Sequence, residues 1–416
     1  MLDGPILQCK SSAGVTTVIK ETIALHRDAL HGVLDWSRSR DYLGYNKHDG
    51  LNSPLLQTLL GFSKWSRILA VQLVMRSPIN IRPLLAVKRV YNPKGLALFV
   101  QSWLDIHRMD SSGSALSEAR GLLQILESLQ ARSESGHSAW GYLYPWQDPG
   151  FFAPAGTPNA VVTAFVCEAF LDAYEITRNS SYIEIVRSSI SFFLQDLHSL
   201  TDSESELCLS YMPTSIPMRM RVMDVSILIG SVIARHCALS GDTTNLPTAR
   251  RLVDYVVARQ TSEGAWFYTD PPEDSRIRHD NYHTGFILDA LWRYMQATGD
   301  MRYERQYALG LDFYRTHLFN ADGSPRWMSD KDFPHDVHGA AQGILTFSRH
   351  QQQFPGFAAT IADWAITHLQ HSSGRFHYQK TRFYTKRFTL MRWCNAWMAR
   401  ALARIALTET RYEKPR

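Results

Sequence analysis

Cysteine pairs and long apolar runs are both missing from this sequence of 416 residues. Its five cysteines are odd in number, widely spaced and never arranged as Cys-x-x-Cys, which argues against a disulfide framework and a zinc ribbon. This usage fits a reducing compartment, so we expect a cytoplasmic protein, with the surface of the inner membrane as an alternative location. The N-terminal segment lacks a basic stretch followed by an apolar one, and no run of about 18 uninterrupted apolar residues predicts a membrane span.

Nucleotide-binding and nucleophile motifs are missing as well. We find no Gly-x-Gly-x-x-Gly loop, no P-loop, no Gly-x-Ser-x-Gly elbow and no cysteine in a protease-like setting. The lack of Asp-Asp-x-x-Asp argues against a terpene cyclase or prenyltransferase. A net charge of +5 is mild and the Lys and Arg residues are scattered, so no nucleic acid is expected as a partner. We expect no cofactor either.

What the sequence does contain is a helical repeat of roughly sixty residues. Segments 161–173 and 286–294 have apolar residues three and four positions apart, which predicts helices. Turns at 177–182, 240–242 and 298–303 recur at the same spacing, and Gly or Asn in them supplies the left-handed residue that ends a helix. Each cycle is therefore predicted to be one helical hairpin.

A second set of turns alternates with the first and joins a glycine to an aromatic residue. These turns include Gly141-Tyr142, 263–266, 322–327 and 374–376, with 209–213 as a degenerate copy. We expect them to share one rim of the molecule. Adding about two more hairpins before residue 130 predicts an all-α fold, an (α/α)6 toroid with six hairpins, or with seven.

The domain organisation follows from the repeat. We expect one domain over 1–416, in which 1–130 holds the less regular hairpins. Strand-like alternation is scarce, which argues against a Rossmann fold or a TIM barrel. An open helical solenoid is the alternative, since sequence cannot show closure.

Two polar clusters occupy the same phase of consecutive repeats, each directly before a helix. Their candidate catalytic residues are Asp280, Tyr282, His283, His335, Asp336 and His338. Carboxyl, phenol and imidazole groups transfer protons once their neighbours shift their pKa. Alternatively, Asp280 is only a helix cap and the second cluster is structural. The spacing of the second cluster matches no strong zinc signature, so we expect no metal. If carboxylates hydrolysed a glycoside, the pair would be Asp280 with Asp336.

Aromatic and basic residues in loops flank these clusters. Rings stack on sugar faces, and guanidinium groups bind carboxylate, sulfate or phosphate in a bidentate manner. The candidate substrate-binding residues are Arg82, Tyr142, Trp146, Gln147, Trp266, Trp327, Tyr384, Arg387 and Arg392. The alternatives are that the loop 140–158 only plugs the toroid and that 374–387 is a solvated loop before packed tryptophans.

Six segments together resemble a family of bacterial proteins from surface-polysaccharide gene clusters, whose members are expected to be α/α toroids. The segments are Gly44–Pro54, Ser77–Pro83, Trp140–Pro158, Asp280–Gly285, His335–Gln342 and Met391–Met398. The segment 280–284 is also similar to the Asp-Tyr-His-Thr segment in the helical domain of D-glucuronyl C5-epimerases, with Asn281 inserted. That similarity implies that Tyr282, His283 and Arg392 act on a uronate. The β-rich domains of those epimerases have no counterpart here.

These observations together predict a carbohydrate-active protein of bacterial exopolysaccharide or capsule biosynthesis. We expect it to act on an oligo- or polysaccharide, uronate-containing or lipid-linked, by general acid/base chemistry in a central groove. Epimerase, lyase and hydrolase variants remain open. The alternative is a non-catalytic glycan-binding or scaffold protein that works with polysaccharide-assembly proteins.

Overall fold

The structure is a computed structural model that describes residues 12–133, 135–218 and 220–413. The N-terminal residues 1–11, where no signal peptide is expected, lie outside this part. Six inner helices form a ring: α4 (Pro93–Asp110), α6 (Ala160–Thr177), α8 (Met223–Ser240), α10 (Asn281–Thr298), α12 (Val337–Phe347) and α14 (Trp397–Glu413). Six outer helices surround them: α1 (Ser12–Arg38), α5 (Gly113–Ser128), α7 (Ser180–Ser191), α9 (Leu246–Val257), α11 (Glu304–His317) and α13 (Phe357–Leu369).

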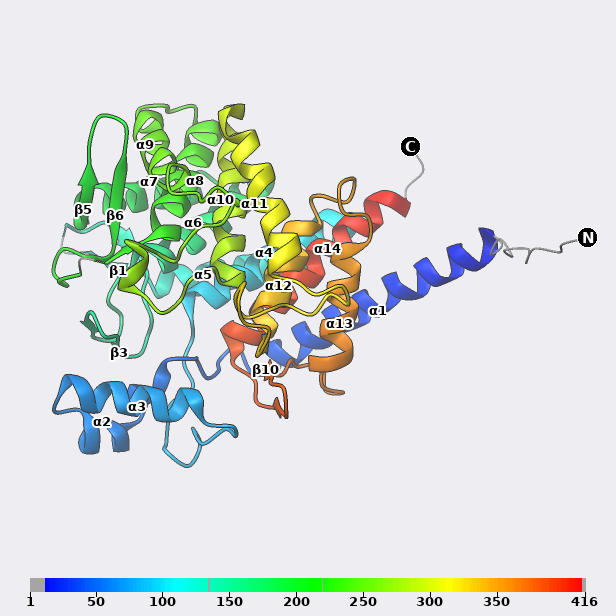
Figure 1. Ribbon diagram of the computed structural model, residues 1–416, viewed down its shortest axis with the longest axis horizontal. Helices are drawn as coiled ribbons and strands as arrows, with labels where there is room; N and C mark the ends of the chain where they lie inside the picture. The colour runs from blue at the N-terminus through cyan, green and yellow to red at the C-terminus, as the bar shows by residue number, and fades with distance from the viewer. Residues whose placement is uncertain (1–11, 134, 219, 414–416) are drawn as a thin grey trace, which may run out of the picture.

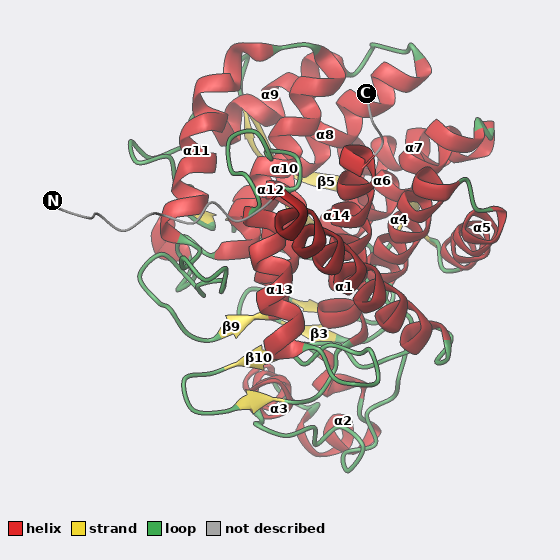
Figure 2. Ribbon diagram, turned by 90° about the vertical axis from the view of Figure 1, so that its right-hand side faces the viewer, coloured by secondary structure: helices red, strands yellow, loops and turns green. Residues whose placement is uncertain are grey.

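The ring is closed. Each inner helix contacts the next in the order given, and α14 returns to α4 (Figures 1 and 2). An internal cavity is lined by residues from all six inner helices, among them Leu98, Phe165, Leu228, Phe286, Gln342 and Trp397. The predicted all-α (α/α)6 toroid with six hairpins is therefore confirmed, and an open solenoid is excluded.

The sixth hairpin joins the two ends of the described chain, because α1 packs on α14 and α13. This corrects our expectation of about two complete hairpins before residue 130. That region supplies one complete hairpin, α4 with α5, together with the outer half of the last one. The last inner helix and the first outer helix cover each other's apolar faces.

Helix patterning explains which helices lie inside. Inner helices are apolar on most sides, and α12 is buried at every residue. The outer helix α9 buries five residues along one side: Ala249, Leu252, Val253, Tyr255 and Val256. Helix α8 is long and apolar enough by composition to cross a membrane, but 78% of it is buried inside the ring, as expected of a core helix.

The turns between inner and outer helices end in left-handed residues, as predicted. Gly241 and Gly299 have φ values of 79° and 69°. In the turn after α6, however, the left-handed residue is Arg178 (φ 55°) and not the expected glycine or asparagine. The neighbouring Asn179 instead caps α7 by accepting a hydrogen bond from the backbone N of Ser181.

The glycine-aromatic turns pack against the next outer helix. Gly323 has φ 86°, and a Cβ on it would lie 2.7 Å from the carbonyl oxygen of Thr360 on α13. Gly374 has φ 90°, and its Cβ would lie 2.2 Å from the carbonyl oxygen of Gly32 on α1. Only glycine fits both the dihedral angle and the close approach. The same turn thus repeats around the ring and closes the last hairpin onto the first helix.

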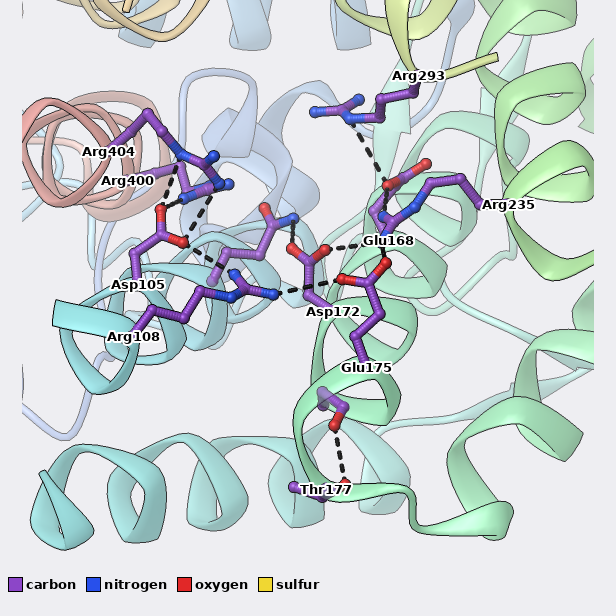
Figure 3. A network of polar contacts seen from close by, with 12 residues as sticks. Asp105, Arg108, Glu168, Asp172, Glu175, Thr177, Arg235, Arg293, Arg400 and Arg404 are labelled. Carbon is purple, nitrogen blue, oxygen red and sulfur yellow. Dashed lines mark hydrogen bonds and ion pairs between the residues drawn. The ribbon is translucent and has the colours of Figure 1, made fainter. Parts of the chain in front are cut away.

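Buried ion pairs tie the inner helices together further along the ring axis (Figure 3). Asp105 of α4 binds Arg400 and Arg404 of α14, the latter at 3.2 Å. Arg235 of α8 binds Glu168 and Asp172 of α6, the latter at 2.9 Å. These pairs lie well past the first turns of the helices. The open end of the ring, which we call the mouth, is therefore where the inner helices begin.

Residues 41–92 leave the ring between α1 and α4 and form a separate lobe (Figure 1). The lobe contains the short 3-10 helix Asp49–Asn52, α2 (Pro54–Leu60) and α3 (Lys64–Arg76). It has a small core of its own: Leu51, Leu56, Ala70, Val71 and Val74. The Nε of Arg67 in this lobe donates to the Oε1 of Gln147 at 2.8 Å, which fastens the lobe to the loop 140–158.

Strands in the described residues are short. The longest pair is the antiparallel β5 (Leu197–Asp202) with β6 (Leu207–Pro213). A three-stranded sheet has the order β11-β10-β9, and the other sheets pair β1 with β2, β3 with β4 and β7 with β8. The bounds of these strands are β1 (Ala131–Arg132), β2 (Ser138–Ala139), β3 (Trp146–Gln147), β4 (Phe152–Ala153), β7 (Arg221–Val222), β8 (Thr269–Asp270), β9 (His335–Asp336), β10 (Gln379–Lys380) and β11 (Thr385–Lys386).

Candidate active site

Three aromatic rings form a floor beneath the mouth. Phe165, Phe286 and Trp397 come from three inner helices and contact one another with ring centroids 5.2–5.5 Å apart. The Nζ of Lys94, in the first turn of α4, lies 3.7 Å from the ring centroid of Phe165 and 4.5 Å from that of Phe286. Burial lowers the pKa of Lys94 well below its ordinary value, and the nearby Arg392 lowers it further, while the rings favour the charged form by cation–π contact.

His338, in the first turn of α12, is enclosed by rings. It stacks on Tyr282 and on Trp397, with centroids 4.6 and 4.3 Å away. Both of its ring nitrogens are buried and have no hydrogen-bond partner among the residues that the structure describes. Burial lowers its pKa well below the ordinary value, and the nearby cations Lys94, Arg392 and Lys47 lower it further. The imidazole is thus neutral and keeps an unengaged basic nitrogen.

Asp280 and His283 form a dyad at the start of α10. The carboxylate can only accept, so the Nδ1 of His283 donates to its Oδ2, at 2.7 Å. The other oxygen accepts from the backbone N of His283 and caps the helix. Asp280 is therefore both the cap and the partner of an imidazole. The bond fixes the tautomer and leaves Nε2 of His283 for other contacts.

A carboxylate on the neighbouring helix faces the same pocket. Asp224, in the first turn of α8, lines a small pocket together with Tyr268, Arg278, Asp280 and His283. Its Oδ1 is buried and has no hydrogen-bond partner in the described part of the chain. Burial raises its pKa, whereas the charges of His283 and Lys94 act in the opposite direction. Asp224 is thus a carboxyl group available for proton transfer.

Two further cations complete the site from above. Arg392 is 3% exposed, lies 5.5 Å from the Tyr142 ring centroid, and has a buried Nε without a partner in the described residues. Lys47, from the lobe, lies with its Nζ 3.7 Å from the Trp393 ring centroid. Burial lowers the pKa of Lys47 to about 8. These charges favour a negatively charged ligand at the mouth.

The lobe roofs the site, and several side chains at its rim stay partly exposed. Lys47 covers Trp393, and the His48 ring lies 5.8 Å from that of Trp146. The side chain of His283 is 17% exposed, and Tyr142, Trp146 and Trp327 are half-buried at the rim. A ligand reaching the buried His338 must pass these rings.

The mouth brings together part of the set predicted from sequence. Asp280, Tyr282, His283, His338 and Arg392 converge there, with Tyr142, Trp146 and Trp327 at the rim. Tyr282 contacts both imidazoles, and burial raises its pKa well above the ordinary value. Its phenol therefore stays protonated and can donate a hydrogen bond.

The structure places the other predicted catalytic residues in supporting positions. The Nδ1 of His335 bonds to the carbonyl oxygen of Pro325 at 2.8 Å, and its ring packs on Trp364 of an outer helix. The oxygens of Asp336 accept three hydrogen bonds, from the Nε1 of Trp393, the Nε2 of Gln379 and the backbone N of His338. Asp336 is thus occupied, and the hydrolytic pair of Asp280 with Asp336 has no free partner. Within the described residues, no three His, Cys, Asp or Glu side chains are grouped to hold a metal ion.

Several predicted binding residues brace the fold or lie outside the mouth. Arg82 pairs with Asp49 at 2.8 Å, and Gln147 accepts from Arg67. Trp266 is buried, and its Nε1 donates to the carbonyl oxygen of Val256. Tyr384 and Arg387 are exposed on the hairpin of β10 and β11.

Sequence reasoning missed Lys47, Lys94, Asp224 and Tyr268. A signal existed for two of them, because Lys94 and Asp224 occupy the first turn of an inner helix, the same phase that singled out Asp280 and His338. Lys47 lies in a segment that carries the family resemblance. Tyr268 follows a glycine-aromatic turn and has no distinguishing pattern.

Comparison with known proteins shows the fold. No protein-family model matches this chain, and no curated protein matches its sequence. A selenomethionine derivative of a family 76 glycoside hydrolase α-mannanase from Bacteroides thetaiotaomicron matches with a TM-score of 0.59 and 16% identity, covering 77% of this chain and 87% of the other. Cellobiose 2-epimerase from Bacillus thermoamylovorans matches with a TM-score of 0.60 and 11% identity, covering 76% and 87%. A family 76 mannosidase from Bacteroides thetaiotaomicron matches with a TM-score of 0.60 and 9% identity, covering 94% and 100%.

Proposed function

We propose that this protein is a carbohydrate-active enzyme that moves a proton on and off a ring carbon of an acidic sugar, as an epimerase does. The observation that carries the proposal is a pair of imidazoles flanking one phenol. Tyr282 contacts His283 at 4.3 Å and His338 at 4.6 Å between ring centroids. Inversion at a carbon requires two acid/base groups, and these two imidazoles both lie against the same phenol.

The roles follow from the surroundings of each imidazole. His338 is neutral and has unpaired nitrogens, so it takes the proton from the carbon next to the sugar carboxylate. The electron pair of the broken C–H bond passes to the carboxylate oxygens. His283, oriented by Asp280 and in contact with solvent through its more exposed position, supplies a proton from the other side. Tyr282 donates a hydrogen bond to the intermediate.

Cations at the mouth can stabilise the negative charge that develops on the substrate when the proton leaves the carbon. Arg392 and Lys47 are buried beside the two histidines, and their positive charges stabilise an anionic carboxylate and its more anionic intermediate. The carboxylates of Asp336 and Asp280 offset the charge of Lys47 in part, and the carboxylate of a uronate would add a negative charge beside Arg392. This arrangement supports a uronate over a neutral hexose.

Hydrolysis is supported less well by the same residues. A glycosidase needs two carboxyl groups on either side of a glycosidic bond. Asp336 is held by three donors and Asp280 by His283, which leaves Asp224 as the free carboxyl group at the mouth among the residues that the structure describes. The matching structures include both a glycoside hydrolase and an epimerase, so the fold does not distinguish the two reactions and the choice rests on the side chains at the mouth.

The setting is part of the proposal. The segments that resemble proteins of bacterial surface-polysaccharide clusters support a role in exopolysaccharide or capsule biosynthesis, on an oligo- or polysaccharide made in the cytoplasm. The half-buried rings of Tyr142, Trp146 and Trp327 provide stacking surfaces for the sugars that flank the reacting unit.

Incubation with uronate-containing oligosaccharides in deuterated water tests this function. We expect deuterium at C5 of the uronate, and its loss in the His338→Gln variant. Neutral mannose and cellobiose serve as the comparison and should show no exchange. Unsaturated products would show that the enzyme is a lyase and not an epimerase. New reducing ends without deuterium exchange would overturn the proposal in favour of hydrolysis. Glycan binding without any turnover would favour the non-catalytic scaffold.

A further inference from the structure

The lobe carries an apolar surface that no described part of the chain covers. Eight of the fifteen large apolar side chains that are exposed in the described residues lie between residues 55 and 84. Phe62, Trp65 and Leu84 are 79%, 72% and 80% exposed. We call these eight residues the apolar face: Leu55, Leu59, Phe62, Trp65, Leu69, Leu73, Ile79 and Leu84.

Helix α3 shows that this exposure is patterned. Its residues Ala70, Val71 and Val74 are buried in the core of the lobe. Trp65, Leu69 and Leu73, spaced four apart, form a second apolar stripe on the other side of the helix and are exposed. A helix that is apolar on two faces is ordinarily covered on both. Here only one face is covered, so the other lacks its partner.

The charge around the apolar face has one sign. Residues 50–92 contain six Lys and Arg residues and no Asp or Glu, and all of these cations except Arg82, which is buried in its pair with Asp49, are at least partly exposed at the surface of the lobe. The segment 375–387, which includes the hairpin of β10 and β11, contains five more cations and no acidic residue. The Nζ of Lys386 on this hairpin donates to the carbonyl oxygen of Arg76 at the end of α3. The hairpin, in which Phe383 is 88% exposed, is thus adjacent to the lobe.

Both views show the lobe and the hairpin at the same end of the molecule (Figures 1 and 2). Trp, Phe and Leu side chains surrounded by Lys and Arg are the composition of segments that lie in a membrane interface and bind anionic lipids. We propose that the apolar face and the tip of the β10–β11 hairpin dock this protein on the surface of an anionic lipid bilayer. The apolar side chains enter the headgroup region, and the cations contact lipid phosphates.

Docking would also place the mouth near the bilayer, because the lobe that carries the apolar face supplies Lys47 and His48 to the roof of the site. A glycan attached to a membrane lipid would then reach the rim from the membrane side. This last step rests on the proposed function, whereas docking itself does not.

Cosedimentation with vesicles tests the proposal. The full chain should bind vesicles of phosphatidylcholine with phosphatidylglycerol, bind less to phosphatidylcholine alone, and lose affinity as salt is added. The double variant Trp65→Ser/Leu69→Ser should weaken binding about tenfold or more, because it removes two inserted side chains. Lys64→Glu/Arg76→Glu should weaken binding to the anionic vesicles only.

A matched control comes from the far side of the ring. Met301 and Leu309 are 48% and 41% exposed outside the lobe, and Met301→Ser/Leu309→Ser should leave vesicle binding unchanged. Thermal unfolding should show that all variants are folded. Turnover of soluble oligosaccharides should survive Trp65→Ser/Leu69→Ser, which separates a failure of docking from a failure of the proposed function. The proposal would be overturned if the protein did not bind anionic vesicles. It would also be overturned if sedimentation analysis showed a dimer of the wild type and a monomer of Trp65→Ser/Leu69→Ser.

Discussion

The imidazole of His338 lies parallel to the phenol of Tyr282, with ring centroids 4.6 Å apart and planes inclined by 11°. On its other side His338 stacks on Trp397 at 4.3 Å. The ring is therefore held between two flat surfaces while neither nitrogen is engaged by the described residues. A rigidly held, unpaired and neutral imidazole is costly to bury, and a role in proton transfer explains it.

His338→Gln should therefore lower the rate of proton exchange by about 10²–10⁴-fold, the usual contribution of a general base. Glycan binding should change little, because the rim and the cations remain. The matched control is His335→Gln, whose imidazole bonds to a backbone carbonyl and packs on Trp364 of an outer helix. Rates from single-turnover kinetics and affinities from calorimetry check both. Equal losses in the two variants would contradict the assignment.

Asp280→Asn separates capping from catalysis. Asparagine caps a helix about as well as aspartate, so the unfolding midpoint should hardly move. The amide cannot hold His283 in the same tautomer by charge, so turnover should fall about 100-fold. Asp300→Asn, which changes a cap far from the mouth, should leave turnover intact. A large loss of stability in Asp280→Asn with normal turnover would show that Asp280 only caps.

The charge of Lys47 predicts a pH dependence of binding. Burial lowers its pKa to about 8, so its charge disappears as the pH rises through that value. Affinity for an acidic glycan should then fall, by roughly tenfold for the loss of one nearby charge. Lys47→Met should bind weakly without this step, and Lys47→Arg should move the step to higher pH. Calorimetric titrations across this pH range measure it.

The same shift acts on folding with the opposite sign. The pKa of Lys47 is below its ordinary value of 10.5, so between about 8 and 10.5 the unfolded chain binds more protons than the folded one. Stability due to this group therefore rises with pH across that window, and below it both states are protonated. Urea unfolding of the wild type against Lys47→Met should show this difference. An identical pH dependence in the two proteins would contradict the shift.

Asp105 tests the ion pairs that join α4 to α14. Its carboxylate is fully buried and binds Arg108, Arg400 and Arg404 (Figure 3). Asp105→Ala leaves buried cations unpaired and should cost about 3–5 kcal/mol in the free energy of unfolding. Glu184→Ala removes an ion pair whose side chains are more than half exposed, and should cost under about 1 kcal/mol. Urea unfolding compares the two.

The sequence predicted much of the fold because helical periodicity and turn chemistry are local. The apolar spacing in 161–173 and 286–294 marked two inner helices, and Gly264, Gly323 and Gly374 marked one repeated turn. The polar residues before Phe286 and before Gly339 predicted the position of the mouth, because helix starts are also recognised from local sequence. The roles given to these residues stay predictions until the variants are measured.

The positions of other residues in the candidate site could not be predicted from local sequence patterns. His335, Asp336 and His338 are close in sequence, but β9 turns the first toward an outer helix and fixes the second among three donors. Lys47 comes from the lobe and reaches the mouth only because the lobe folds over it. Spacing along the chain cannot distinguish these outcomes.

By itself, the sequence determined a helical repeat, its turns and the placement of polar groups at helix starts, since these depend on neighbours within about one turn. The tertiary structure alone decided that α1 completes the last hairpin, that Asp105 meets Arg400, and that Asp224 and His283 face one pocket. The reason is closure of the ring. It brings together residues hundreds of positions apart, and the angle between successive hairpins, which sets closure, depends on side-chain packing between helices and leaves no periodic trace in the chain.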